Sequence, residues 1–188
     1  MSVSKRTVYI RFFSGVNAHS INNLISIVDQ KLKEGVNEFV ILISSGGGTV
    51  FHGLSAYNYL VGIPAKIITH NFGSVDSIAC VLFCAGSTRY SVPHARFLLH
   101  GVATSFPQGA SLEEPQLEER LKGLKIDIEN IAKVIGATTN KTKEQIVKAL
   151  LERTTLNPEQ AKEFGLVHEI KASLIEAGAE LIPIDQPQ

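Results

Sequence analysis

Tryptophan is absent from these 188 residues, methionine occurs once and cysteine only twice. Two cysteines cannot build the disulfide framework of a small secreted domain. Cys80 and Cys84 lie four residues apart in an apolar run, so we expect both to point to one face of a helix as small core residues. No further ligands stand near them in the sequence, so we predict no metal site and no cofactor.

Net charge and long apolar runs are also lacking. Eighteen basic and eighteen acidic residues cancel, which gives no electrostatic reason to expect nucleic acid or an anionic membrane as partner. The apolar runs are shorter than the ~18 residues of a membrane span, and residues 1–7 lack the apolar segment of a signal peptide. We therefore predict a cytoplasmic protein with one domain over residues 1–188.

Strand and helix patterns alternate along the first hundred residues. Strands are expected at 8–13, 39–43, 65–69 and 97–99, and helices at 21–32, 50–61 and 78–85. The continuous apolar run 39–43 is typical of a strand covered on both faces. The alternation predicts an α/β layered domain with right-handed parallel crossovers.

The second half of the chain is dominated by a narrow apolar stripe. Leucine and isoleucine recur at intervals of four and three residues from Leu117 to Ile135, after a loop at 103–115. This pattern predicts one long helix whose seam packs on its own domain or, as we favour, on a neighbouring subunit. Helices are then expected at 143–151 and after Asn157, a strand at 166–170, and a tail that frays from Pro183 to Gln188.

Two segments carry candidate chemistry. Gly46, Gly47 and Gly48 follow the buried strand 39–43, where glycines let the backbone approach a ligand, although a simple flexible turn is the alternative. Ser77 precedes the apolar run 78–85, and a helix N-terminus there would offer unpaired N–H groups and partial positive charge. His100 ends the strand 97–99. We predict that Ser77 attacks a carbonyl and that His100 takes its proton.

The order and spacing of these segments resemble the proteolytic subunit of the Clp protease family, within the ClpP/crotonase superfamily. Ile43–Val50 is similar to that family's strand and glycine-rich loop, and Gly73–Gly86 to its nucleophile helix. Arg96–Gly101 resembles its histidine strand and Glu159–Ile170 its closing helix and strand. The resemblance implies a layered α/β spiral of ββα units with a protruding handle helix, the handle region spanning about 103–151.

The same resemblance implies a function. Ser77 would be the nucleophile, His100 the general base, and Gly48 and Ile78 the oxyanion-hole donors. Homo-oligomeric rings would enclose these serines in a chamber that admits peptides or unfolded proteins, making the chain a serine endopeptidase.

Three departures from the family pattern qualify this expectation. The acidic member of the triad falls on Arg153, or on Thr154 after one deletion, and neither can replace a carboxylate. Asp76 and Ala79 stand where the family has small residues, which could charge or narrow the cleft. The short segment before the first strand argues against a Clp ATPase partner, so activity is expected without ATP.

Two alternatives follow from these departures. One is a catalytically weak, structural or regulatory Clp-like subunit. A structure with no acceptor within hydrogen-bond reach of His100 Nδ1 would favour this alternative. The other is a crotonase-like enzyme acting on an acyl-CoA thioester, which needs a carboxylate aimed into the cleft; Asp76 is the local candidate.

Overall fold

The computed structural model describes residues 5–185. One mixed sheet runs through the described chain in the order β6-β5-β3-β2-β1-β8, with β4 paired to β3 and β7 paired to β4. The strands are β1 (Thr7–Phe13), β2 (Glu38–Ser45), β3 (Lys66–Asp76), β4 (Thr88–Ser91), β5 (Arg96–Leu98), β6 (Thr155–Leu156), β7 (Glu169–Ile170) and β8 (Leu181–Asp185). The neighbours β1, β2 and β3 are parallel, as predicted, and only β5 and β6 pair in the antiparallel sense.

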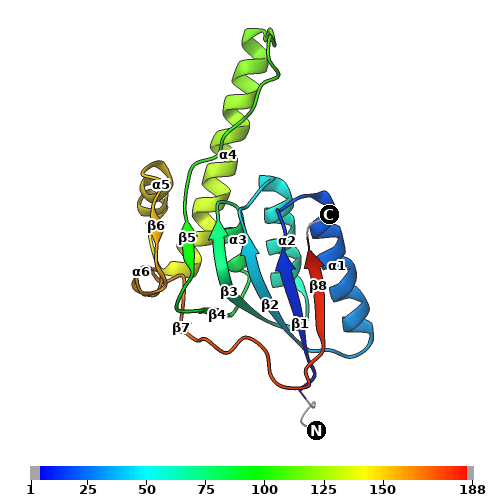
Figure 1. Cartoon of the computed structure of the whole chain (residues 1–188). Coiled ribbons are helices and arrows are strands. Elements are labelled where there is room, and N and C mark those ends of the chain that lie inside the picture. The colour runs from blue at the N-terminus through cyan, green and yellow to red at the C-terminus, as the bar shows by residue number, and fades with distance from the viewer. Residues whose placement is uncertain (1–4, 186–188) are drawn as a thin grey trace.

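Helices cover one face of this sheet. They are α1 (Ala18–Lys33), α2 (Val50–Gly62), α3 (Ala79–Phe83), α4 (Glu114–Thr139), α5 (Lys143–Leu151) and α6 (Pro158–Phe164); Figure 1 shows α1, α2 and α3 on the same side of the strands. Phe39, Ile41 and Ile43 of β2 face this main core, whereas Val40 and Leu42 belong to a smaller cluster on the other face. The apolar run 39–43 is therefore a doubly covered strand, as its composition predicted.

The long helix α4 stands out from the body. In Figure 1 it extends away from the sheet, and the stretch that follows β5 runs outward beside it to its free end. Its apolar seam is divided: Ile131 and Ile135 are buried against the chain's own core, whereas Leu117 and Leu121 are 50% and 52% exposed. The prediction of a neighbouring partner therefore concerns only the outer half of the seam.

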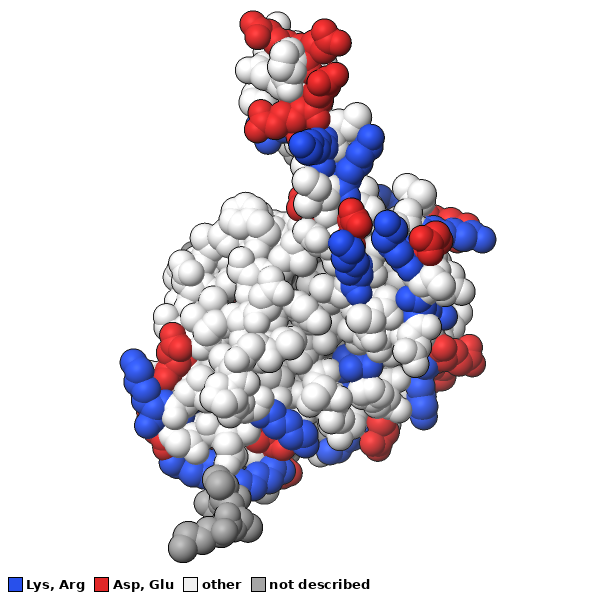
Figure 2. All heavy atoms as spheres, turned by 180° about the vertical axis from the view of Figure 1, so that it is seen from behind, with Lys and Arg blue, Asp and Glu red and all other residues white. Residues whose placement is uncertain are grey.

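Charge is sorted along the same helix. Figure 2 shows acidic side chains at the free end of α4 and basic ones next along it. The acidic residues are Glu113, Glu114, Glu118 and Glu119, and the basic ones are Arg120, Lys122 and Lys125. The handle is therefore dipolar, with its sign change one to two turns from the end.

A buried arginine fixes the base of the handle to the sheet. Arg89 of β4 donates hydrogen bonds to the carbonyl oxygens of Leu166 (2.7 Å) and Gly86 (3.0 Å), and to those of Thr138 and Gly165 (both 3.3 Å). These oxygens lie at the C-terminal ends of helices or just beyond them, where carbonyls lack intrahelical partners. The guanidinium thus holds α3, α4 and α6 in one arrangement.

Two expectations about the ends of elements are wrong. Residues 183–185 do not fray: they belong to β8, which pairs in parallel with β1 and adds an ion pair between Arg11 and Asp185 (2.7 Å). Residues 186–188, like residues 1–4, lie outside the described part. The strand expected at 65–69 continues to Asp76, so His70 is a buried residue in mid-strand.

Candidate active site

Ser77 occupies a sharp turn between β3 and α3. Its backbone φ is 59°, in the left-handed region that a residue with a side chain seldom adopts. Its N–H donates to Leu98 O (2.7 Å), which ties the turn to β5. The predicted helix over 78–85 is shorter than expected: α3 covers only Ala79–Phe83 with Ile78 as N-cap. The hydroxyl therefore gains its position from a strained strand-to-helix turn, not from a long helix.

His100 follows β5 and lies half-buried beside the same turn. Its Nδ1 is 2.7 Å from Gly101 O. A carbonyl oxygen can only accept, so Nδ1 carries the hydrogen and a neutral ring leaves Nε2 with its lone pair free. That tautomer is the one a general base needs. Gly101 O thus provides the acceptor whose absence would have favoured an inactive subunit.

Two backbone N–H groups in this region have no protein acceptor among residues 5–185. They belong to Gly48 and Ile78; the adjoining bonds Val16 N–H to Gly47 O and Thr49 N–H to Val16 O (both 2.8 Å) leave the Gly48 N–H unused. An isolated parallel bridge joins Gly48 to Val16. Free N–H groups held by a rigid backbone are suited to stabilising an oxyanion.

All four sequence-predicted site residues line one cavity. It has a volume of about 160 Å³, and its walls hold Gly48, Ser77, Ile78 and His100 together with the apolar side chains of Val50, Val102, Ile131 and Leu150. The serine hydroxyl and the histidine ring make no hydrogen bond with each other within residues 5–185. The fold brings the four groups to one small, largely apolar space, where electrostatic interactions are stronger than in water.

A family comparison adds to this geometry. The sequence model of the Clp protease family, described as "Clp protease", matches residues 5–173. The chain belongs to the Clp protease family. Among solved structures, a mutant of ClpP1 from Listeria monocytogenes is similar to it, with a TM-score of 0.77 and 24% sequence identity over 89% of this chain and 92% of that one. The predicted resemblance is confirmed, and the fold is the ClpP fold.

Arg153 and Thr154, on which the sequence resemblance placed the family's triad acid, bring no carboxylate to the site. Arg153 has φ 53° and lies in the reversal between α5 and β6. The Thr154 hydroxyl donates to Ala149 O (2.9 Å), while its carbonyl accepts from the Leu99 N–H (2.9 Å). The segment therefore lies directly beside the strand that carries His100, but it supplies a backbone contact instead of an acid.

The second departure, at Asp76 and Ala79, does not reach the cavity. Asp76 is nearly buried, and its two oxygens accept from Ser74 Oγ (2.7 Å) and Arg96 Nη2 (2.7 Å). Neither Asp76 nor the buried Ala79 lines the Ser77 cavity. Asp76 thus neither charges the cavity nor offers the free carboxylate that crotonase-like chemistry requires.

The cysteines and the other histidines contribute no nucleophile or metal site. Cys80 and Cys84 are buried and unpaired, as predicted, and burial raises the pKa of both thiols. His70 Nε2 lies 2.9 Å from Lys171 O, and His168 Nδ1 accepts from the Arg89 N–H (3.0 Å). Among residues 5–185, no three His, Cys, Asp or Glu side chains gather as a metal site. No helix of that part is long and apolar enough to cross a membrane.

Sequence reasoning missed the larger opening outside the Ser77 cavity. A cleft of about 390 Å³ lies between the start of α2 and the outer half of α4, and it shares Gly48, Val50, Val102 and Ala103 with that cavity. The available signal was Gly123, a glycine in the middle of the predicted long helix, where a small residue often marks close approach or open space.

Proposed function

We propose that this chain is a serine peptidase of Clp type that cleaves peptides and unfolded proteins inside a homo-oligomeric chamber. One observation carries the proposal: a strained serine, a histidine with its Nδ1 hydrogen bonded, and two unused N–H groups line the same cavity. This is the set of groups that acyl transfer requires.

The reaction follows from the roles of these groups. Ser77 Oγ attacks the peptide carbonyl as His100 Nε2 takes its proton, and the Gly48 and Ile78 N–H groups stabilise the tetrahedral oxyanion. The His100 proton then passes to the leaving amine, and an acyl ester remains on Ser77. Water, deprotonated by His100, attacks the ester and restores the serine.

Gly101 O takes the orienting role that a carboxylate has in a full triad. It fixes the tautomer of His100, but a neutral carbonyl stabilises the transient imidazolium less than a charged acid does. Loss of the acid costs about 10⁴ in turnover in a serine protease. We therefore propose slow turnover, with acylation and deacylation both slowed because His100 takes a proton in each step.

Labelling by a fluorophosphonate probe tests the proposal, because the probe needs only the nucleophile, base and oxyanion hole. We expect one label per chain, located on Ser77 by mass spectrometry, and none in Ser77→Ala. Ser55→Ala is the matched control, since Ser55 is an exposed serine on α2. Absence of labelling in the folded, assembled wild-type protein would contradict the peptidase proposal.

One observation favours a second candidate, a catalytically weak or inactive regulatory subunit: the position on which the resemblance places the acid holds Arg153. The same labelling experiment separates the inactive form from the peptidase, because an inactive subunit leaves Ser77 unmodified even when it assembles.

Assembly is proposed from the handle. Leu117, Leu121 and Ile126 leave about half of their surface exposed on α4, and the dipolar charge pattern suits antiparallel contact with a second copy. Mass photometry should give the mass of a multi-subunit ring, and Leu121→Glu should reduce that mass.

Independence from an ATPase stays a prediction, because it concerns a segment that includes residues 1–4. Equal peptide turnover with and without ATP would support it.

A further inference from the structure

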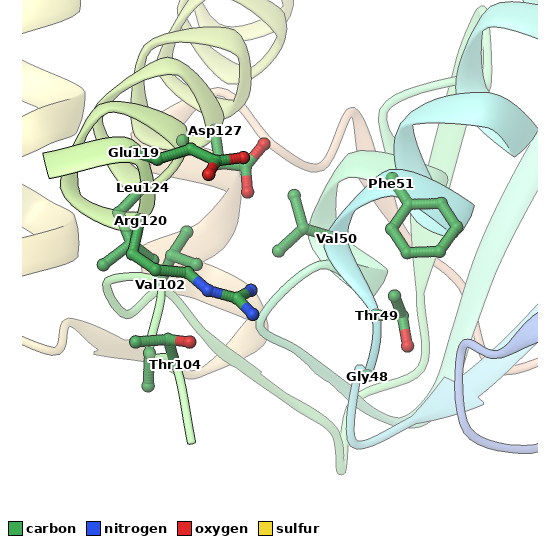
Figure 3. A pocket seen from close by; sticks show the side chains of 12 residues that line it. Gly48, Thr49, Val50, Phe51, Val102, Thr104, Glu119, Arg120, Leu124 and Asp127 are labelled. Carbon is green, nitrogen blue, oxygen red and sulfur yellow. The ribbon is translucent and has the colours of Figure 1, made fainter. Parts of the chain in front are cut away.

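The cleft next to the Ser77 cavity has one wall formed by a single face of α4. This wall consists of Glu119, Arg120, Gly123, Leu124 and Asp127 (Figure 3), whose spacings of three and four residues place them on the same side of a helix. A Cβ added to Gly123 would meet nothing within 4 Å. This glycine leaves open space between Arg120 and Asp127, although a mid-helix glycine costs about 1 kcal/mol relative to alanine.

Charged groups on this wall lack protein partners. Neither Arg120 nor Asp127 forms an ion pair within residues 5–185, whereas Glu129, two residues further along, is paired with Lys133 (3.2 Å) and Lys143 (3.6 Å). Figure 3 shows the Arg120 guanidinium extending from α4 toward the side of the cleft formed by Thr49 and Val50. Asp127 is half-buried, and burial raises the pKa of its carboxyl group. A cation placed beside it would favour the charged form.

The position of Asp127 along α4 relates it to the reaction. Ile131, one turn further along on the same face, lines the Ser77 cavity. At 1.5 Å per residue Asp127 is about 6 Å from Ile131 along the helix axis, whereas Arg120 is about 16 Å away. A side chain of lysine length that enters beside Val50 and Ile131 is therefore long enough to reach Asp127.

We propose that Asp127 is a specificity-determining residue that selects peptides with a lysine or arginine on the carbonyl side of the bond cut at Ser77. The inference rests on the proposed peptidase function. The aliphatic stem of the substrate side chain packs on Val50 and Ile131, as such stems do on apolar surfaces, and its cationic end pairs with the otherwise unpaired carboxylate. Leucine-like side chains fill the same cavity but leave Asp127 without a partner.

Two fluorogenic peptides that differ only in lysine or norleucine at this position test the proposal, since norleucine keeps the stem and removes the charge. We expect wild-type protein to prefer lysine by about tenfold or more in kcat/KM. Asp127→Asn should reduce that ratio to near one and Asp127→Glu should keep most of it. Glu129→Gln is the matched control, because it removes an equal charge from α4 at a place that does not line the cleft.

The outcomes separate this inference from the peptidase proposal. Equal cleavage of both peptides by wild type, or an equal effect of Asp127→Asn and Glu129→Gln, overturns the role of Asp127 and leaves the peptidase intact. If neither peptide is cleaved, the peptidase proposal fails, and anisotropy measurements of both peptides on Ser77→Ala decide the inference. Tighter binding of the lysine peptide that Asp127→Asn abolishes supports it, and equal binding overturns it.

Discussion

Gly48→Ala should be among the most damaging single-methyl additions in this protein. A Cβ at this position would lie 2.2 Å from Val16 O, and the backbone φ of 151° is one that residues with side chains rarely adopt. The bridge to Val16 must then open, which breaks the bonds Val16 N–H to Gly47 O and Thr49 N–H to Val16 O. Each bond contributes about 1 kcal/mol net, and the backbone strain costs about 1–3 kcal/mol.

Together these effects predict a loss of about 3–5 kcal/mol in the free energy of unfolding, out of the roughly 5–15 kcal/mol typical of a whole domain. Gly46→Ala is the matched control two residues away: its added Cβ would meet nothing within 4 Å and its φ is not in the left-handed region. We expect that variant to stay within about 0.5 kcal/mol of wild type.

Urea unfolding followed by circular dichroism measures both values, and labelling of Ser77 by the fluorophosphonate reports the site. Displacing the Gly48 N–H should slow labelling by about 10²-fold or more, as loss of one oxyanion donor does, whereas Gly46→Ala should label at the wild-type rate. Equal stabilities for the two variants would refute the account of the glycine loop. Normal labelling in a destabilised Gly48→Ala would refute the role of its N–H.

Three further predictions concern single residues. Burial lowers the pKa of His70 to about 4 from 6.5, so below pH 6.5 the unfolded chain binds a proton that the folded chain excludes. The free energy of unfolding should therefore be highest above pH 6.5 and fall by about 2–3 kcal/mol on going to pH 4.5. Urea titration should show a smaller fall in His70→Gln. Arg89→Met leaves buried carbonyls unpaired and should cost about 3 kcal/mol or more, whereas Arg11→Met, which breaks an exposed pair, should cost less than about 1 kcal/mol in the same assay. Arg153→Asp suits the left-handed backbone there (φ 53°) and places a carboxylate beside the His100 strand, so kcat/KM should rise by about tenfold or more; an unchanged value in a folded variant would contradict it.

Much of the fold could be predicted because local pattern and burial agree. The run 39–43 predicts a strand because it is short, continuous and apolar, and the seam from Leu117 to Ile135 predicts a helix by its periodicity. The strand β8 could not be predicted, since its sequence Leu-Ile-Pro-Ile-Asp is short and contains proline. It becomes a strand because β1 offers a free edge, which is a long-range effect.

The candidate site could be predicted in its residue types but not in its geometry. Ser77, His100, Gly48 and Ile78 share one cavity, yet the left-handed turn at Ser77 follows from the pairing of β3 with β5, which one sequence does not reveal. The tautomer of His100 depends on the backbone carbonyl of Gly101. Every residue type has such a carbonyl, so the sequence gives no sign of this contact. Asp127 lies on a helix face that periodicity assigned only to packing.

The pairing of β8 with β1 has a consequence for synthesis of the protein. These strands are separated by more than 160 residues in the chain, so β1 leaves the ribosome long before its outer neighbour exists. During that interval its edge exposes unpaired backbone groups to other nascent chains. Translation speed and early chaperone contact should therefore influence the yield of folded protein.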